Sequence, residues 1–383
     1  MIPYGRQDIT DEDIQAVIEV LESDFLTQGP VVPAFERKIA SYTSSQHAVA
    51  VNSATSALHI ACLALGLGKG DWLWTSPISF VASANCGLYC GAQVDFIDID
   101  LQTYNINTET LEEKLIEAEL KGKLPKVVIP VHLCGHSCDM QAIHKLAKRF
   151  GFSIIEDASH AIGGSYLSNK LGSCEYSDIT VFSFHPVKII TTGEGGMLTT
   201  NSSELNYKLR LLRSHGVSRE DFTHKSDTDG DWYYEQSLLG FNYRLTDLQS
   251  ALGISQLKRI DSFIAARTKL ASHYTESLNR LPIILPTQMS YAASAWHLYV
   301  IQIDTDLTKA RREDVYKKMK AAGIGVNVHY IPIHTQPYYR RLGFKQGDFP
   351  YAEQYYSKAL TLPLYPSLTQ QEYVIETLKA ALA

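Results

Sequence analysis

The sequence has few cysteines and no long hydrophobic run. Six cysteines in 383 residues are too few for a disulfide framework, and free thiols are typical of a reducing compartment. No run of about 18 apolar residues, the length that would cross a bilayer, is present. The first residues, MIPYGRQDITDED, lack the charged and apolar regions of a secretory signal. We therefore expect a soluble cytoplasmic protein.

The sequence also lacks low-complexity blocks, long runs of one charge and any excess of positive charge. Its hydrophobic content of 45% and charged content of 20% are those of ordinary globular proteins, so we expect the whole chain to fold. The formal net charge of -6 gives no electrostatic reason to expect nucleic acid or an anionic membrane as a partner.

Between residues 47 and 200, short β-rich runs alternate with helical patterns. The runs read HAVAVNS, DWLWTSP, AQVDFIDID, KVVIPVHL, SIIEDAS and DITVFSF. This alternation predicts an α/β layer with a largely parallel sheet, in which ligands bind beyond the carboxyl ends of the strands.

A long helical stretch follows at residues 245–281, interrupted only by Gly253. After it come a strand candidate (WHLYVIQID), an amphipathic helix (RREDVYKKMKAAG), a second strand candidate (IGVNVHY) and a last helix (QQEYVIETLKAAL). We therefore predict a large domain over residues 1–250, and a linker helix with a smaller C-terminal α+β domain over residues 251–383.

Two polar segments follow predicted strands. In NSATSA, residues 52–57, free N–H groups and the helix dipole converge at a helix start, where they can hold a phosphate. The same residues also fit a simple N-cap by Ser53 or Thr55. In IIEDASHA, Glu156, Asp157 and His160 come just past an apolar strand. A carboxylate there can pair with a ligand cation such as a protonated ring nitrogen, or cap the next helix.

A third segment, SFHPVKIITTGEGG at residues 183–196, ends a strand with a single lysine. Pro186 disfavours helix at the preceding residue, and the glycines indicate a tight turn into another strand. Lys188 could be a desolvated amine ready for Schiff-base chemistry, although a single lysine is more often a solvated surface group. In this order, a phosphate cradle, an aspartate and a lysine match the phosphate, the protonated pyridine and the aldehyde of pyridoxal phosphate.

Motifs along nearly the whole chain resemble those of the DegT-like sugar-nucleotide aminotransferases, which have the type I fold of pyridoxal-phosphate enzymes. The matching segments read FLTQGP, NSATSAL, PISFVASAN, HLCGHSCDM, EDASHAIGG, SFHPVKIITTGEGG, RSHGV, GFNYRLTDLQSALG and VHYIPIHTQPYY. Within this family, PISFVASAN, NSATSAL and SFHPVK look most like the C-4 aminotransferases of pseudaminic acid biosynthesis. The resemblance implies a mixed, mostly parallel sheet flanked by helices, pyridoxal 5'-phosphate as cofactor, a UDP-linked 4-keto-6-deoxy-N-acetylhexosamine as substrate and glutamate as amino donor.

The resemblance also implies the roles of single residues. Lys188 matches the Schiff-base lysine, and Asp157 matches the carboxylate that pairs with the pyridine nitrogen. The other cofactor positions are Ala54, Thr55 and Ser183 at the phosphate, Phe80 stacked on the ring, His160 near the 3-hydroxyl oxygen in place of a frequent Gln, and Asn242 reaching the phosphate of a neighbouring subunit. The substrate positions are Tyr4, Asp24, Phe25, Leu26, Thr27, Asn327, Val328, His329 and Tyr330, together with Ala54, Ser183 and Asn242. The position of Asn242 implies a homodimer with shared active sites.

Several other functions share part of this pattern. A C-3 aminotransferase, or one acting on another nucleotide keto sugar, would carry the same motifs. A dehydratase of the same family usually carries His where this chain has Lys188. A non-catalytic sensor would bind the cofactor or the sugar nucleotide without converting it.

Two further motifs have residues that metal or nucleotide sites also use. HLCGHSC brings His132, Cys134, His136 and Cys138 together, but no second ligand pair at zinc-finger spacing appears, and the family has a similar segment without metal. We therefore predict no metal site. GLGKG, at residues 66–70, has neither Walker nor GxGxxG spacing and predicts a turn that ends a helix.

Overall fold

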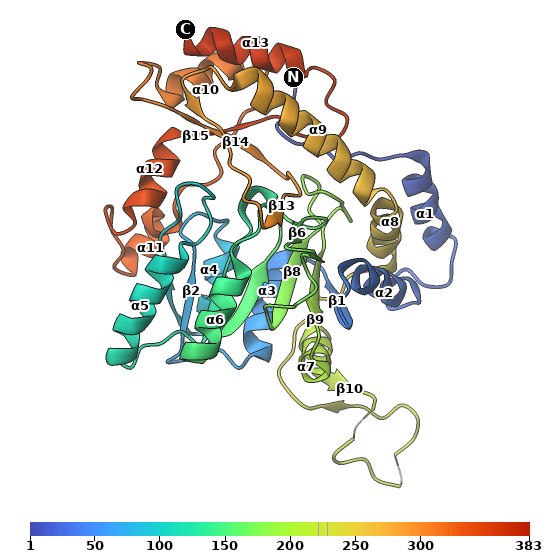
Figure 1. The fold of residues 1–383 in the computed structure, drawn as a ribbon. Coiled ribbons are helices and arrows are strands. Elements are labelled where there is room, and N and C mark those ends of the chain that lie inside the picture. The colour runs from blue at the N-terminus through green and yellow to red at the C-terminus, as the bar shows by residue number, and fades with distance from the viewer. Residues whose placement is uncertain (221, 228) are drawn as a thin grey trace.

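The computed structural model describes residues 1–220, 222–227 and 229–383 (Figure 1). Its centre is a seven-stranded sheet. In spatial order the strands are β1 (His47–Val51), β9 (Gly196–Thr200), β8 (Ile179–Ser183), β5 (Ser153–Asp157), β4 (Val127–Ile129), β2 (Trp72–Thr75) and β3 (Gln93–Phe96). From β8 to β3 the neighbours are parallel, whereas β9 runs antiparallel to both β1 and β8. The predicted mixed, mostly parallel sheet is confirmed.

Helices cover both faces of this sheet. Alternate strand residues face opposite sides, so Val181 packs with one layer of helices and Phe182 with the other. The first layer consists of α3 (Ala54–Ala64), α4 (Ala82–Tyr89) and α7 (Ser203–Arg213). The second consists of α2 (Val31–Thr43), α5 (Thr108–Leu120) and α6 (Met140–Phe150). Because both faces are buried, the strands consist mainly of apolar residues, and β5 and β8 end in the polar residues Asp157 and Ser183.

The C-terminal part has its own antiparallel sheet and its own hydrophobic cluster. Helix α8 (Asp247–Leu257) is followed by α9 (Ile260–Leu278), which crosses to this part (Figure 1). The sheet and its helices are β12 (Ile283–Ile284), β14 (Tyr299–Ile303), β15 (Ala359–Leu362), α10 (Arg312–Ala321) and α13 (Gln371–Leu382). The predicted strand WHLYVIQID and the two predicted helices are thus present, whereas the domain boundary at residue 250 stays a prediction.

Gly253 does not interrupt the helical stretch as the sequence predicted. It lies within α8, and the break falls at Lys258 and Arg259, between α8 and α9. A Cβ at position 253 would lie 2.6 Å from Cζ of Phe35 in α2. The glycine therefore allows α2 and α8 to pack closely.

Residues 324–330 do not form the predicted strand. Only isolated bridges occur there, from Ile324 to Ile2 and from Asn327 to Thr361. The segment is instead held between the N-terminus of the chain and β15. This arrangement leaves the residues after Asn327 free to turn toward the large sheet.

The remaining elements surround these two parts. Helix α1 (Asp11–Leu21) packs on α8, and a short hairpin of β10 (Val217–Ser218) and β11 (Glu235–Gln236) projects from the body (Figure 1). The others are η1 (Leu133–Gly135), β6 (Ser165–Tyr166), β7 (Asn169–Lys170), β13 (Ala292–Ala293), η2 (Ile333–Thr335), α11 (Pro337–Arg341) and α12 (Pro350–Lys358). Within the described ranges, no helix combines the length and apolarity needed to cross a membrane.

Candidate active site

The carboxyl ends of β5 and β8 and the start of α3 open on one cavity of about 540 Å³. The cavity lies where the α/β topology predicts ligands to bind. Most of the predicted site residues line it, from both ends of the chain. They are Tyr4, Ala54, Thr55, Phe80, Asp157, His160, Ser183, Lys188, Asn327, Val328, His329 and Tyr330.

The start of α3 lies at one end of the cavity. Ser53 is the N-cap and its Oγ accepts a hydrogen bond from the N–H of Ser56 at 3.1 Å, so the predicted N-cap by Ser53 is confirmed. In the described part of the chain, the N–H groups of Ala54 and Thr55 have no acceptor. Both therefore remain free to bind an anion at the positive end of the helix dipole.

Asp157 ends β5 and its carboxylate is fixed by two donors. Oδ2 accepts a hydrogen bond from Ser83 Oγ at 2.6 Å, and Oδ1 accepts one from the N–H of Ser159 at 3.1 Å. Ser79 lies 2.7 Å from Ser83 and continues this chain of hydroxyls. Together these donors fix the orientation of the carboxylate. Sequence reasoning missed Ser83, although it lies within the PISFVASAN motif.

Lys188 lies in the loop that connects β8 to β9. The loop is closed at its base, where the N–H of Phe184 donates to Gly195 O at 2.9 Å and the N–H of Thr192 donates to Phe184 O at 3.0 Å. Lys188 is partly exposed to the cavity. Burial lowers its pKa to about 8, while the nearby Asp157 carboxylate acts in the opposite sense. The amine is therefore much easier to deprotonate than an ordinary lysine.

Two neutral imidazoles lie near this amine. His160 Nδ1 accepts a hydrogen bond from the N–H of Cys134 at 3.3 Å, and its Nε2 lies 3.1 Å from Tyr330 Oη. Burial, together with the charges of Lys188 and His329, holds the pKa of His160 well below its ordinary value. His329 Nδ1 lies 2.8 Å from Thr361 Oγ1, and burial with the charge of Lys188 lowers the pKa of His329 to about 3. Both rings are therefore uncharged at neutral pH.

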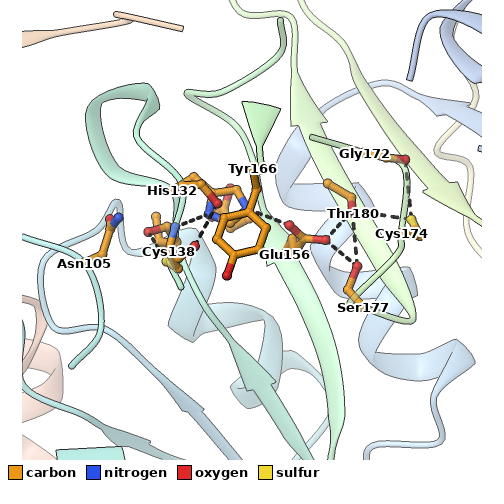
Figure 2. A network of polar contacts seen from close by, with 12 residues as sticks. Asn105, His132, Cys138, Glu156, Tyr166, Gly172, Cys174, Ser177 and Thr180 are labelled. Atoms are coloured by element: carbon orange, nitrogen blue, oxygen red, sulfur yellow. Dashed lines mark hydrogen bonds and ion pairs between the residues drawn. The ribbon is translucent and has the colours of Figure 1, made fainter. Parts of the chain in front are cut away.

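Glu156 faces away from the cavity, because it precedes Asp157 on the strand. Its carboxylate contacts His132 Nε2 at 2.7 Å, Thr180 Oγ1 at 3.0 Å and the Ser177 hydroxyl (Figure 2). Burial raises the pKa of Glu156, but the His132 contact and the hydroxyl donors lower it on balance. These buried hydrogen bonds therefore stabilise β5 on the side that faces away from the cavity.

The HLCGHSC segment contributes His132 and Cys138 to the hydrogen-bond network of Glu156. The N–H of Cys138 donates to His132 Nδ1 at 3.1 Å (Figure 2), and His136 Nδ1 lies 2.9 Å from Ser137 O. Cys134 lies in η1 with φ +61°, and not on a strand with His132. In the described residues, no three His, Cys, Asp or Glu side chains are arranged to hold a metal ion.

The other predicted positions do not line this cavity. Thr27 bridges to Thr246 and Asn242 bridges to Ser214, which places both outside the cavity of the same chain. The side chains of Phe25 and Leu26 are exposed at 53% and 47%, and Asp24 precedes them. A residue that serves a neighbouring subunit would lie outside the cavity of its own chain, so these roles stay predictions.

The polar groups of the cavity fit the chemistry of pyridoxal phosphate. The free N–H groups of Ala54 and Thr55 and the Ser183 hydroxyl suit a phosphate. The fixed Asp157 carboxylate suits a protonated ring nitrogen, and the Lys188 amine suits an aldehyde. Gly196 completes the fit, because a Cβ there would lie 2.6 Å from the Ala54 nitrogen and block the cradle.

Two curated relatives match almost the whole chain. The chain is 41% identical over 383 residues to the spore coat polysaccharide biosynthesis protein SpsC of Bacillus subtilis, covering 99% of this chain and 96% of that protein. It is 36% identical over 383 residues to the UDP-4-amino-4,6-dideoxy-N-acetyl-beta-L-altrosamine transaminase of Campylobacter jejuni, with 99% and 96% covered.

Solved structures give the same fold. Helicobacter pylori PseC, an aminotransferase of pseudoaminic acid biosynthesis, matches with a TM-score of 0.89 at 32% identity, over 100% of this chain and 99% of that one. Spr1654 of Streptococcus pneumoniae, in its PMP form, matches with a TM-score of 0.90 at 29% identity, over 100% and 99%. The same protein in its PLP form matches with a TM-score of 0.89.

A model of the DegT/DnrJ/EryC1/StrS aminotransferase family matches residues 7–379, which is nearly the entire chain. The match agrees with the cavity, in which a lysine, an aspartate and a helix start converge as that chemistry requires. The chain belongs to the DegT/DnrJ/EryC1/StrS aminotransferase family, and its cofactor is pyridoxal phosphate.

Proposed function

We propose that this aminotransferase converts a UDP-linked 4-keto-6-deoxy-N-acetylhexosamine into its 4-amino sugar, with glutamate as the amino donor. The product would be UDP-4-amino-4,6-dideoxy-N-acetyl-beta-L-altrosamine, the sugar named for the Campylobacter relative. The observation that supports catalysis most directly is the convergence of Lys188, Asp157 and the start of α3 on one cavity.

Different residues of the cavity would bind different groups of the cofactor. Ala54, Thr55 and Ser183 would bind the phosphate, and Asp157 would keep a proton on the ring nitrogen, with Ser83 fixing the carboxylate. When bound, pyridoxal phosphate supplies an aldehyde that exchanges amino groups and a ring that accepts an electron pair.

Lys188 would bond to the cofactor in the resting enzyme and move protons during turnover. Its Nζ would take the proton from the α-carbon of glutamate in the first half-reaction, and deliver a proton to C-4 of the sugar in the second. A pKa of about 8 suits this double role, since the group can both accept and release a proton near neutral pH. Two half-reactions on one site predict ping-pong kinetics.

The remaining cofactor and substrate roles rest on the family resemblance. Phe80 lies at the cavity with 60% of its surface exposed, where it can cover the ring, and His160 lies near Lys188. Tyr4 and the residues Asn327, Val328, His329 and Tyr330 form the far wall, where the sugar nucleotide would lie.

The higher identity to SpsC supports an alternative substrate. The identity to SpsC is 41%, higher than the 36% to the Campylobacter transaminase. An amino transfer to another nucleotide keto sugar, at C-4 or C-3, is therefore the alternative. The sugar must be identified by experiment, because the motifs that carry the chemistry are common to the family.

We further propose a cytoplasmic homodimer with shared active sites. Asn242 and residues 24–27 lie outside the cavity of their own chain, as expected if they serve a neighbouring subunit. All six cysteines are free thiols, which supports a reducing compartment. The molecular mass in solution, and activity recovered by mixing a Lys188→Ala chain with an Asn242→Ala chain, test the shared site.

The substrate is tested with a panel of UDP-, dTDP- and GDP-linked keto sugars, each with glutamate. The products are identified by mass and by NMR of the new amine centre. We expect turnover of the UDP-linked 4-keto sugar and an amine at C-4. Turnover of only a dTDP- or GDP-linked sugar, or an amine at C-3, would favour the alternative.

A separate experiment distinguishes an enzyme from a sensor or a dehydratase. The purified protein is mixed with glutamate alone, and the visible absorbance of the bound cofactor is followed while 2-oxoglutarate is measured. We expect one equivalent of 2-oxoglutarate per site and a matching change in the spectrum. A protein that only binds its ligands would release none.

A further inference from the structure

The first turn of α8 contacts two segments that are distant from it in the sequence. Thr246 is the N-cap of this helix, and Asp247 and Gln249 are its first and third residues. Asp247 is fully buried and Gln249 is half-buried. Neither residue lines the cavity. Each side chain nevertheless binds the backbone of a segment that contains residues of the site or residues predicted for it.

Gln249 connects the helix start to the loop that carries Lys188, residues 184–195. Its Oε1 accepts hydrogen bonds from the N–H of Thr246 at 3.1 Å and from Thr246 Oγ1 at 2.9 Å, and its Nε2 donates to Glu194 O at 2.8 Å. The orientation of the amide is therefore fixed, because a backbone N–H needs the oxygen and a carbonyl needs the NH2 group. Glu194 itself lines the cavity.

The carbonyl of Glu194 lies at the base of this loop. It directly precedes Gly195, whose carbonyl oxygen accepts the hydrogen bond from the N–H of Phe184. The other donor to Glu194 O is Thr192 Oγ1 at 2.7 Å, which belongs to the loop itself. The Gln249 contact thus attaches this end of the loop to a helix, and a shift of the base would move Lys188.

Asp247 connects the same helix start to the segment that precedes α2. Its Oδ2 accepts a hydrogen bond from the N–H of Gly29 at 2.6 Å, and its Oδ1 accepts one from the N–H of Val32 at 2.8 Å. Its own N–H donates to Leu26 O at 3.0 Å. A Cβ at position 29 would lie 2.3 Å from Oδ2, so this close approach requires glycine.

The two oxygens of Asp247 are both needed for these contacts. The carboxylate lies at the starts of α2 and α8, and the positive ends of both helix dipoles favour a negative charge there. Asparagine has the same shape but only one acceptor oxygen, so its NH2 group would face one of the two N–H donors. Asp247→Asn therefore removes a hydrogen bond without leaving a cavity.

We propose that Gln249 and Asp247 are positioning residues with separate tasks. Gln249 holds the base of the loop, so that the Lys188 amine stays in its place in the cavity. Asp247 holds residues 24–27, which would bind the sugar nucleotide, and this part rests on the proposed function. Neither side chain touches a reacting atom, so each acts through the backbone that it binds.

Gln249→Glu separates the contact with the loop from the cap of the helix. Glutamate still accepts from Thr246 and is favoured near a helix start, but its second oxygen has no hydrogen to donate to Glu194 O. Each half-reaction is followed in a single turnover by the visible absorbance of the bound cofactor. We expect maximum rates about threefold to tenfold lower in both, at unchanged half-saturating concentrations. Gln15→Glu makes the same change at an exposed position of α1 and should have no effect.

Asp247→Asn should instead affect the sugar nucleotide alone. With the keto sugar that the wild type turns over, the half-saturating concentration should rise about tenfold while the maximum rate stays close to that of the wild type. The half-reaction with glutamate should stay close to the wild type in both parameters. The control is Asp11→Asn, since Asp11 is exposed and is also the first residue of its helix. Loss of fold stability alone would change both half-reactions.

Hydrogen exchange of the assembled, cofactor-loaded protein tests the contacts without relying on activity. Amides of residues 184–195 should exchange faster in Gln249→Glu, and those of residues 24–32 faster in Asp247→Asn. Unchanged exchange in these segments, or the same kinetic losses in both variants, would overturn the proposal. A wild type that reacts with neither glutamate nor a keto sugar contradicts the proposed function instead, and the exchange rates then decide whether the two residues hold these segments.

Discussion

Lys188 and Asp157 lie close enough for each charge to affect the other. Burial favours the neutral amine, whereas the carboxylate favours the ammonium, and burial is the larger effect. The balance leaves an amine with a pKa of about 8 beside a carboxylate held by Ser83 and Ser159. The site thereby places an easily deprotonated amine near a carboxylate of fixed orientation.

Replacing Lys188 by Ala should abolish turnover. The variant retains the phosphate cradle and Asp157, so we expect it to bind the cofactor but to lose the absorbance that depends on a covalent bond to lysine. Steady-state assays and visible spectra check this. Lys145→Ala, which removes an exposed lysine on α6, is the control and should be unaffected. An active Lys188→Ala enzyme with an unchanged spectrum contradicts the assignment.

The pH dependence of cofactor loading should report the Lys188 amine. The neutral amine is the nucleophile, so the rate at which the cofactor-free protein regains visible absorbance should rise with pH and level off above about 8. In Asp157→Asn the opposing negative charge is gone, and the midpoint should move to lower pH. Stopped-flow measurements over a pH series test both statements. A midpoint that stays the same in the variant would argue against coupling between the two residues.

Ser83 should act as a positioning residue for Asp157. Its removal deletes one hydrogen bond to a charged group, worth about 1.5–3 kcal/mol, so Ser83→Ala should lose about tenfold to a hundredfold in kcat. Asp157→Asn should lose more, since it removes the charge itself, while still binding cofactor. A pH titration of the bound cofactor distinguishes this role from general damage to the fold. The ring nitrogen should lose its proton at lower pH in Ser83→Ala, and an unshifted titration would assign Ser83 a structural role only.

At the scale of elements, the site depends on how closely β9 passes the start of α3. Gly196 is the first residue of β9 and pairs with both Val51 and Ser183. Its Cα faces the backbone of Ser53 and Ala54, which cannot move aside as a flexible side chain would. Gly196 therefore lies where the turn into β9 meets the start of α3.

Gly196→Ala should weaken cofactor binding. A Cβ would lie 2.6 Å from backbone atoms of residues 53 and 54, and we expect a cost of about 1–3 kcal/mol as α3 shifts. If that cost falls on the cradle, the Kd for pyridoxal phosphate rises about tenfold or more. Gly68→Ala is the matched control, because its Cβ would meet nothing within 4 Å. Equal affinities for the two variants, measured by fluorescence titration, would refute this role of Gly196.

The elements that carry the site were predictable because β5 and β8 are short, mainly apolar runs that end in polar residues. The sequence therefore placed Asp157 and Lys188 at strand ends, and both line the cavity. The Ser83 contact was not predictable, since it joins residues 74 apart. The segment IGVNVHY has the alternation of a strand, but contacts with distant parts of the chain decide its conformation.

At the scale of the whole molecule, polar groups are buried where the C-terminal part meets the large sheet. Arg267 of α9 is buried and its Nη1 donates to the carbonyl oxygens of Trp296, His297 and Leu364 at 3.0–3.2 Å. Burial lowers the pKa of Arg267 to about 10. His297 lies against His160, with ring centroids 4.4 Å apart, and its pKa is also lowered, mainly by burial. Neutral imidazoles therefore fill the space between the two parts.

These imidazoles should make the protein sensitive to acid. The pKa of His329 is about 3 in the folded chain, whereas an unfolded histidine has its ordinary value near 6.5. Between these values the unfolded chain binds more protons, so the free energy of unfolding falls as pH falls, by about 1.4 kcal/mol per pH unit for this group. The stabilisation is complete above about pH 6.5 and is lost progressively below it.

Replacing His329 by Gln should remove that part of the acid sensitivity. Urea unfolding of the cofactor-loaded protein at pH 7, 6 and 5 gives the free energy of unfolding at each pH. The change of this free energy with pH is the test, because Gln also alters the contact with Thr361 and so changes the absolute stability. Between pH 6 and 5 the variant should lose about 1.4 kcal/mol less than the wild type. His224→Gln changes an exposed histidine and should leave the slope as it is. If wild type and His329→Gln have the same slope, protonation of His329 does not contribute to acid unfolding, and the imidazoles at this contact are not held neutral by the fold.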